Sequence, residues 1–429
     1  MRNGGGCRPL RVLFVSRGLF DERDSFKVGF QMRTFSEMEA VISRRNVRRP
    51  IEALLLDFEE RRLLERHALN GAAGRSGSPV MDQRVKRRVV NMHAPRFDAM
   101  ALKYSVWALE SIWGAAIVAA VALKSKADII HTHGEWATFS SIPASRLLRV
   151  PLIYDIHGVL EELFPRGTGR GLAYKVVKLF ERICIRGASR LIVVSEAMKT
   201  HFGGSYDSKA MVVPCSVDPR FMQWDGSERS EARREMALDG RFVVAFSGSF
   251  FPHWQQPHKM APVFKEIRAR IPGSLFLVLT TDEVASVRDF LTCAGLDAAD
   301  LEVRKLAHAD VPRYLAAADA GLLIRARDII NKVASPVKFA EYLACGVPVL
   351  CTQGIGDVSD VVRDHGVGLV IDNDLERVDW DRVCEDLLEL ANTETRDRCR
   401  RVARDLFSWE THAALIEDLY LELAPPSST

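Results

Sequence analysis

Residues 331–352 read Asn-Lys-Val-Ala-Ser-Pro-Val-Lys-Phe-Ala-Glu-Tyr-Leu-Ala-Cys-Gly-Val-Pro-Val-Leu-Cys-Thr, which predicts a loop, a short helix and a buried strand. Ser335 can cap the helix, and Pro336 suits its first position, where a missing N–H costs nothing. Gly346 suits the left-handed residue just past the helix end. Residues 347–351 then read as a strand.

Lys338 and Glu341 share one face of this helix because they are three residues apart. A lysine in the first turn opposes the helix dipole, and Lys before Glu is the weaker pairing order. A cation there makes better sense if an anion lies in front of the helix, and the carboxylate could accept two hydrogen bonds from a ribose diol. The segment therefore indicates a nucleotide-diphosphate site. The alternative is an ordinary surface Lys–Glu pair, which the spacing alone favours.

The rest of the chain predicts two α/β halves, because nearly all-apolar strands alternate with helices in each half. The first half has expected strands at 11–16, 51–57, 128–133, 152–157, 190–195 and 211–217, and helices at 29–42 and 99–124. The basic segment 83–90 reads either as a strand or as a mobile loop, and the polar segment 224–240 as a linker. The second half has expected strands at 242–247, 274–280, 301–306, 320–325 and 368–371, and helices at 262–270, 286–294, 311–317, 380–391 and 404–423.

Parallel doubly wound sheets bind ligands beyond the carboxyl ends of their strands. His133, His157 and Ser195 end strands of the first half, and Arg325 ends a strand of the second. One such histidine is often only a hydrogen-bonding residue, but several along one edge favour a site.

Charge is uneven along the chain although its net value is only +3. Residues 1–225 carry 35 Lys/Arg against 23 Asp/Glu, a net charge of +12, whereas residues 226–429 have a net charge of −9. The first half therefore either meets something anionic or has a solvated basic face. An apolar content of 47% is ordinary for a globular protein.

The eight cysteines show no Cys-x-x-Cys pair and no zinc-type spacing. Four of them read as small core residues, which favours a reducing cytoplasm: Cys184, Cys215, Cys345 and Cys351. The apolar run 12–15 is too short for a signal peptide, and 112–123 is shorter than the roughly 20 residues that span a bilayer. No transmembrane helix is expected.

The segment 331–352 resembles the donor-binding signature of family-4 glycosyltransferases, in the subgroup that reads Ser-Pro-x-Lys-x-x-Glu-Tyr-Leu-Ala-x-Gly-x-Pro-Val. Six further motifs come in the family's order and spacing: 131–136, 154–158, 193–196, 213–218, 247–249 and 407–410. The resemblance implies an α/β protein of GT-B fold, with two facing doubly wound Rossmann-like domains and an inter-domain cleft. It implies an acceptor-side domain at 1–225, a donor-binding domain at 226–405 and a C-terminal helix at 406–429 that packs back toward the first domain.

The same resemblance implies retaining transfer from a nucleotide-diphosphate sugar to a glycan or lipid-linked acceptor, without metal or other cofactor, in cell-surface polysaccharide or glycolipid synthesis. Glu341 matches the glutamate that binds the ribose, and His157 matches a histidine near the reacting sugar. The expected catalytic residues are His157 and Lys338. The expected donor-binding residues are Gly248, Ser249, Arg325, Lys332, Ser335, Glu341, Ala307 and His308. The expected acceptor-side residues are His133 and Glu161.

Two departures from the family pattern affect these roles. Val333 stands where many members carry a second glutamate, so Ser335 and Lys338 could fill its space. Ser249 lies near a position where members carry a cation, so the cation that stabilises the leaving β-phosphate is expected to be Arg325, Lys332 or Lys338. Backbone N–H groups of the Gly248–Ser249 turn would assist.

Other activities compete with this interpretation. A sugar-nucleotide epimerase of the same fold, or a degenerate nucleotide-binding protein without turnover, remain alternatives. A dinucleotide dehydrogenase lacks its glycine fingerprint after a first strand, and no nucleic-acid module accompanies the basic charge. Basic clusters at 44–49 and 84–88, with Trp107 and Trp113, suit an anionic membrane surface, unless the tryptophans pack in the core and the arginines are only solvated. We expect a cytoplasmic protein, peripheral at the inner face of the cytoplasmic membrane.

Overall fold

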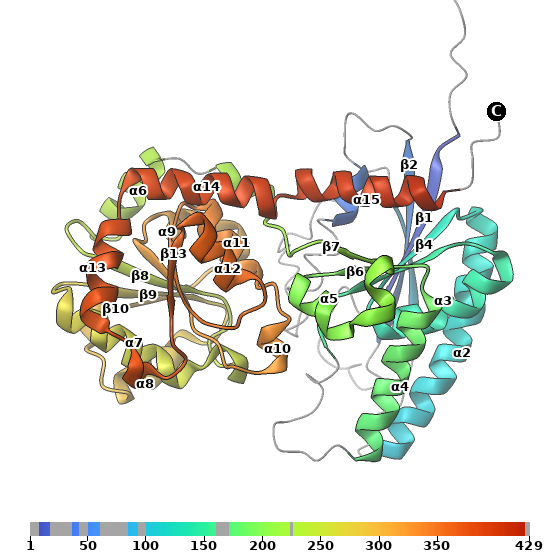
Figure 1. The fold of residues 1–429 in the computed structure, drawn as a ribbon, viewed down its shortest axis with the longest axis horizontal. Helices are drawn as coiled ribbons and strands as arrows, with labels where there is room; N and C mark the ends of the chain where they lie inside the picture. Colours follow the sequence, from blue (N-terminus) through green and yellow to red (C-terminus); the bar gives the residue numbers. More distant parts are fainter. Residues whose placement is uncertain are drawn as a thin grey trace, which may run out of the picture. The chain divides into compact units, whose positions relative to one another are not determined.

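The computed structural model describes residues 8–17, 37–42, 50–60, 85–92, 100–159, 171–223 and 226–424, which form two compact units (Figure 1). Unit 1 comprises residues 1–193, 204–211 and 413–429, and unit 2 comprises residues 194–203 and 212–412. The division therefore falls earlier in the chain than the expected boundary after residue 225. The C-terminal residues from 413 onward group with unit 1.

Unit 1 is built on a seven-stranded sheet in its described part, in the order β3-β2-β1-β4-β5-β6-β7. The pairings from β3 through to β6 are parallel. Its strands are β1 (Leu10–Arg17), β2 (Ile51–Glu60), β3 (Val85–Met92), β4 (Ile129–His133), β5 (Leu152–Ile156), β6 (Arg190–Val193) and β7 (Ala210–Val212). Its principal helices are α2 (Met100–Ser125), α3 (Glu135–Leu148) and α4 (Leu172–Gly187), with α3 packed between the other two (Figure 1).

Unit 2 is built on a six-stranded parallel sheet in the order β10-β9-β8-β11-β12-β13. Its strands are β8 (Val243–Ser247), β9 (Leu275–Thr280), β10 (Leu301–Lys305), β11 (Ala320–Leu323), β12 (Val349–Thr352) and β13 (Gly368–Ile371). Its helices include α5 (Glu196–Phe202), α6 (Gly226–Glu235), α7 (Pro257–Arg270), α8 (Val284–Cys293), α9 (Val311–Ala316), α10 (Ile329–Lys332), α11 (Val337–Ala344), α12 (Val358–His365), α13 (Trp380–Leu390) and α14 (Thr393–Phe407).

Burial on both faces explains why the central strands β8 and β9 read as unbroken apolar runs. In β8, Val243 and Ala245 belong to one core cluster, whereas Val244 and Phe246 belong to the cluster on the opposite face. Side chains of a strand alternate between its two faces, so one apolar run supplies two cores. The expected strands at 242–247, 274–280 and 368–371 are present to within one residue at each end.

Two expectations about the second half are wrong. The polar segment predicted as a linker contains helix α6, whose Arg229 and Arg233 pair with Asp319, so its charges stabilise unit 2. The single helix predicted at 404–423 is two helices, α14 and α15 (Trp409–Leu423), because the chain is extended at Ser408. The Ser408 hydroxyl accepts the N–H of Thr411 at 3.2 Å and so caps the second helix.

In the first half, the ambiguous basic segment is the strand β3 over its described residues, paired with β2. Residues 37–42 are helical, and the remainder of the helix expected at 29–42 lies outside the described residues. None of the helices in the described part of the chain has the length and apolar character to cross a membrane.

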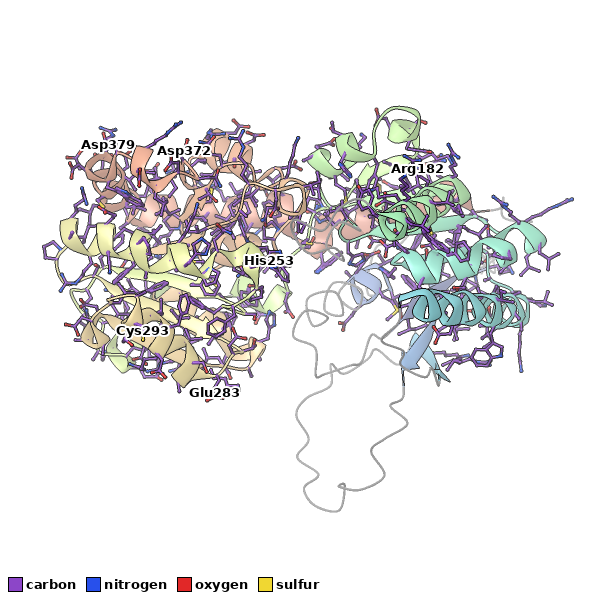
Figure 2. All side chains as sticks on the ribbon, turned by 90° about the horizontal axis from the view of Figure 1, so that it is seen from below. Arg182, His253, Glu283, Cys293, Asp372 and Asp379 are labelled. Atoms are coloured by element: carbon purple, nitrogen blue, oxygen red, sulfur yellow. The ribbon has the colours of Figure 1, made fainter. Side chains whose placement is uncertain are left out.

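The cysteines are mostly buried, as their apolar surroundings predicted. Cys184, Cys345 and Cys351 lie in the core, whereas Cys215 is half-buried. Cys384 and Cys399 are buried as well. Among the described cysteines, Cys293 is exposed, at the end of α8 (Figure 2).

Candidate functional site

Four polar side chains and one glycine lie at the carboxyl ends of five neighbouring strands in unit 2. The strands β10, β9, β8, β11 and β12 are followed or ended, respectively, by His308, Asp282, Gly248, Arg325 and Thr352. Ligands of parallel α/β sheets bind at this edge. The prediction that Arg325 reaches the edge is confirmed, since its backbone N–H donates to the Thr352 hydroxyl at 2.9 Å.

Helix α11 follows this edge and begins differently from the prediction. Pro336 is its N-cap, and no side chain caps the helix. Ser335 does not cap it, because its hydroxyl instead accepts the backbone N–H of Cys215 at 3.0 Å. The C-terminus is as predicted: Gly346 has φ 70°, and the N–H of Val347 donates to the carbonyl of Tyr342 at 2.9 Å.

Lys338, in the first turn of α11, is buried and lies against the Phe246 ring, with its Nζ 4.2 Å from the ring centre. Its Nζ has no hydrogen-bond partner among the described residues. Burial lowers the pKa of Lys338 well below its ordinary value, and the neighbouring charge of Arg325 lowers it further. The charges of Glu341 and Asp282 oppose this shift.

Gly248 gives the lysine its space. Its φ is 108°, and a Cβ at this position would lie 3.2 Å from Lys338 Nζ. The Gly248 N–H donates to the carbonyl of Leu279 at 2.8 Å. The expectation that this N–H would bind a phosphate is therefore wrong, because the group is already hydrogen-bonded. The Ser249 hydroxyl donates to Asp282 Oδ1 at 3.0 Å, which ties the turn after β8 to the end of β9.

Arg325 is a second buried cation at this edge. Its Nη1 donates to Asn331 Oδ1 at 3.5 Å, a long contact, and its Nε has no partner among the described residues. Burial lowers the pKa of Arg325 to about 10. Two buried cations therefore lie near each other at this edge, with few acceptors among the described residues.

Glu341 lies one turn further along α11 and is held by a histidine. His308 Nε2 and Glu341 Oε1 are 2.9 Å apart, and the carboxylate is buried. The His308 ring packs against Phe221, with centroids 5.2 Å apart. Ala307 is exposed directly before it. The structure therefore brings together two of the expected donor-binding residues, Glu341 and His308.

Lys332 and Val333 make no described contact with this group. Lys332 is exposed at the end of α10. Val333, at the position of the missing family glutamate, is buried, and its carbonyl accepts the Ser195 hydroxyl at 2.7 Å. This position therefore packs α10 against the start of α5.

The histidines of unit 1 form a separate group at the ends of β4 and β5. His133 Nδ1 and His157 Nε2 are 3.1 Å apart, and Asp155 Oδ2 lies 3.4 Å from the first and 3.2 Å from the second. His157 retains a side-chain exposure of 14%, whereas His133 and Asp155 are buried. Glu161 lies outside the described residues.

Sequence reasoning missed three residues of these groups: Asp155, Asp282 and Asn331. Asp155 lies inside a motif whose histidine alone was assigned. Asp282 is the second residue after β9, which is the same position that Arg325 has after β11. The position of Asn331 depends on Asp328, whose carboxylate accepts the Asn331 N–H at 2.8 Å.

Comparisons with known families match both halves of the chain. Residues 62–221 match the model described as Glycosyltransferase Family 4, and residues 241–390 match the model described as Glycosyl transferases group 1. The D-inositol 3-phosphate glycosyltransferase of Arthrobacter sp. (strain FB24) is 24% identical over 316 residues, which cover 68% of this chain and 70% of that protein.

Solved structures share the fold over nearly the whole chain. The Anabaena protein Alr3699/HepE, in complex with UDP, superposes with a TM-score of 0.64 at 17% identity, covering 96% of this chain and 100% of its own. WaaG, described as a glycosyltransferase involved in lipopolysaccharide biosynthesis, gives 0.61 at 14% identity, covering 95% and 99%. A glycosyltransferase from Rickettsia africae ESF-5 gives 0.65 at 12% identity, covering 97% and 99%.

Proposed function

Because this chain is a glycosyltransferase of family 4 with the two-domain GT-B fold, we propose that it transfers a sugar from a nucleotide-diphosphate sugar to a glycan or lipid-linked acceptor. The observation that carries the proposal is the neighbouring pair of buried cations, Lys338 and Arg325, at the carboxyl edge of the unit 2 sheet.

The diphosphate is the part of the donor that these cations would bind. Two neighbouring buried cations repel each other, and burial costs each of them hydration. A diphosphate supplies acceptor oxygens for Lys338 Nζ and for the Arg325 guanidinium, so binding would relieve both costs. The site would therefore bind the anion more strongly than surface cations could.

The ribose is assigned to Glu341. Its carboxylate can accept two hydroxyl hydrogen bonds, and the contact with His308 fixes its orientation. Solved HepE complexes contain UDP or UDP-glucose, which supports a uridine nucleotide as the first donor to test.

We assign the leaving-group stabilisation to protein cations rather than to a metal. Negative charge grows on the β-phosphate as the bond to the sugar breaks, and buried preorganised cations stabilise it strongly. Lys338 and Arg325 are such groups. The retaining outcome and the role of His157, as a hydrogen-bonding group for the reacting sugar, rest on the family resemblance. Asp155 would orient the His157 ring through the 3.2 Å contact.

A surface glycan or glycolipid is the proposed product class. The involvement of WaaG in lipopolysaccharide biosynthesis supports this pathway. In unit 1, helix α2 exposes the side chains of Ile112 and Trp113. The same unit has a hollow of about 820 Å³ whose lining includes one carboxylate, Glu52, and five cations: Arg11, Lys86, Arg88, Lys124 and Lys126. These residues support peripheral binding at an anionic membrane, on the cytoplasmic side. Cluster 44–49, Arg84 and the Trp107 side chain lie outside the described residues.

Thermal-shift measurements with UDP-, GDP- and ADP-glucose test the donor assignment. A ligand present at 100 times its Kd stabilises the folded state by roughly 2.7 kcal/mol, so the matching nucleotide should raise the unfolding midpoint clearly. Release of nucleotide diphosphate on turnover would then establish transfer or donor hydrolysis. Epimerised donor as the product would favour the epimerase alternative, and binding without turnover the degenerate one. A midpoint unmoved by all three nucleotides contradicts the proposal.

A further inference from the structure

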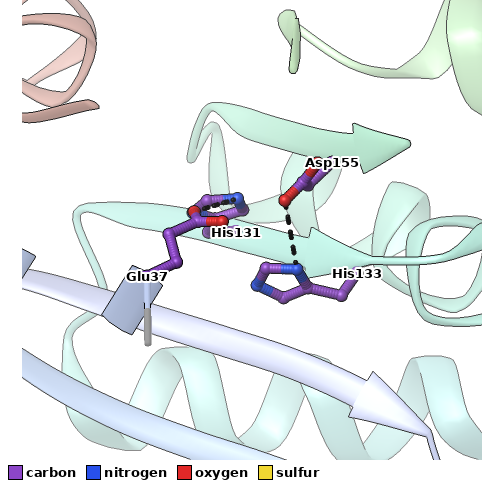
Figure 3. A group of neighbouring side chains, drawn as sticks. All are labelled: Glu37, His131, His133 and Asp155. Carbon is purple, nitrogen blue, oxygen red and sulfur yellow. Dashed lines mark ion pairs between the residues drawn. The ribbon is translucent and has the colours of Figure 1, made fainter. Parts of the chain in front are cut away.

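Four buried side chains converge in unit 1, at the carboxyl ends of β4 and β5: Glu37, His131, His133 and Asp155 (Figure 3). Each offers one nitrogen or oxygen atom, and these atoms all lie within 4.8 Å of one another. We propose that this cluster binds one divalent transition-metal ion, with Zn²⁺ as the ion to test.

The backbone brings three of the four side chains together. His131 and His133 are two residues apart on β4, so their side chains point to the same face of the sheet. Strand register pairs His133 with Asp155 on β5. Glu37 comes from the helical segment 37–42, nearly a hundred residues earlier in the chain, and Figure 3 shows its carboxylate directed at the His131 ring.

Two of the separations between ligand atoms already match those around a tetrahedrally coordinated ion. His131 Nε2 lies 3.5 Å from Glu37 Oε1, and His133 Nδ1 lies 3.4 Å from Asp155 Oδ2. Bonds of about 2.0–2.2 Å to a tetrahedral Zn²⁺ place neighbouring ligand atoms roughly 3.3–3.6 Å apart. The longest separation, 4.8 Å, would have to shorten by about 1 Å on binding. The His131 and His133 rings, now stacked with centroids 4.8 Å apart, would turn toward the ion.

Neighbouring side chains already hold two of the ligands in place. His131 Nδ1 is hydrogen-bonded to the Tyr420 hydroxyl at 2.7 Å, which leaves Nε2 directed at Glu37. Asp155 is in contact with His157 Nε2 at 3.2 Å. Ligand histidines and carboxylates of metal sites have such outer partners, which fix the ring tautomer and the ligand orientation.

The donor set identifies the class of ion and its role. Imidazole with carboxylate suits Zn²⁺ and its first-row neighbours better than Ca²⁺ or Mg²⁺, which prefer oxygen ligands. Four protein ligands leave no position for substrate, so the ion would be structural. It would fix the ends of β4 and β5, and with them His157, which directly follows β5. Sequence spacing gives no sign of this set, because Glu37 is so distant from the histidines.

Metal content tests the proposal without any assay of transfer. The full chain would be stripped with EDTA, dialysed against Zn²⁺, and freed of loose metal, and its bound zinc measured by mass spectrometry. We expect close to one ion per chain and a higher unfolding midpoint than that of the stripped protein. Co²⁺ in place of Zn²⁺ should give the visible bands of a tetrahedral site.

Variants locate the ion. Glu37→Gln and Asp155→Asn keep the side-chain shape, and each should lose most of the bound zinc and the zinc-dependent rise in midpoint. His365→Gln changes an exposed histidine of unit 2 and should retain both. Wild-type protein without stoichiometric zinc, or variants that bind as much as wild type, would overturn the proposal. The cluster would then be a network held by hydrogen bonds alone.

Discussion

The ammonium group of Lys338 lies 4.2 Å from the centre of the Phe246 ring. An aromatic face attracts a cation, by about 2 kcal/mol or more when both are removed from water. This contact explains how a lysine persists in the first turn of α11, where the helix dipole opposes it. The ring accepts no conventional hydrogen bond, and no acceptor among the described residues bonds to the ammonium, so its three donors are available to an anionic ligand.

The lowered pKa of Lys338 should make nucleotide affinity depend on pH. The free protein holds Lys338 charged only below its lowered pKa, whereas a bound diphosphate favours the charged form. Affinity should therefore be full at low pH and fall by up to about tenfold per pH unit as the pH rises through that pKa. Calorimetric titration with UDP at a series of pH values, extending from below neutrality to alkaline pH, measures the slope.

The matched variant for this titration is Lys338→Met, which keeps the length of the side chain. It should bind UDP weakly and with a flatter pH dependence. Its unliganded unfolding midpoint should rise, because a buried cation is replaced by an apolar group. A variant that loses stability but keeps wild-type affinity would make Lys338 a packing residue.

Glu341→Ala should weaken nucleotide binding, because the ribose diol loses its acceptor. Loss of a hydrogen bond to a charged group costs about 1.5–3 kcal/mol, which corresponds to roughly a 10- to 150-fold rise in Kd. Equilibrium binding of UDP measures the change. Glu385→Ala, on the exposed side of α13, serves as the control and should bind as wild type does. Equal affinity of the two variants would remove Glu341 from the site.

His157→Ala should separate binding from turnover. The nucleotide contacts assigned to unit 2 do not involve His157, so UDP affinity should stay close to that of wild type. The transfer rate should fall by roughly 100-fold or more, as expected for a hydrogen-bonding or proton-transferring group at the reacting centre. His258→Ala, an exposed histidine on α7, is the control. A wild-type rate in His157→Ala would show that this histidine has a structural role.

Vesicle binding tests the membrane proposal. The protein should sediment with phosphatidylglycerol vesicles at low salt, remain in the supernatant with phosphatidylcholine vesicles, and dissociate as salt screens the charges. The Lys124→Gln/Lys126→Gln double variant should lose about 2 kcal/mol of vesicle affinity, or roughly 30-fold. Arg401→Gln/Arg404→Gln, on the exposed face of α14, should lose none. Equal recovery in the supernatant with both lipids contradicts the proposal.

Most strands of the two sheets were predictable because each carries its own signal, but the basic β3 was not distinguished from a loop, and the strand expected at 211–217 ends at Val212. A strand buried on both faces is an unbroken apolar run, so β8 and β9 could be predicted from their residues alone. The left-handed Gly346 was predictable for the same reason, since a helix end followed by glycine is a local pattern.

The remaining features depend on contacts between residues far apart in sequence. Ser335 has the sequence context of a helix cap. Its hydroxyl instead accepts a hydrogen bond from the N–H of Cys215, which is 120 residues away in sequence. Segment 226–235 has the polar composition of a linker, but it forms a helix whose arginines pair with the distant Asp319. Asp282 and Glu37 each join their groups only through the fold. Local sequence therefore identified the edge of the sheet at which polar residues gather, but only some of the residues that lie there.

The distribution of thiols in the core and on the surface has a practical consequence for labelling. Burial raises the pKa of Cys351 and Cys399 to about 12 and of Cys384 to about 11, so these groups stay protonated and unreactive toward maleimides at neutral pH. Cys293 is exposed at the end of α8 in unit 2. A fluorophore attached there would follow ligand-induced changes in that unit without disturbing the buried cations.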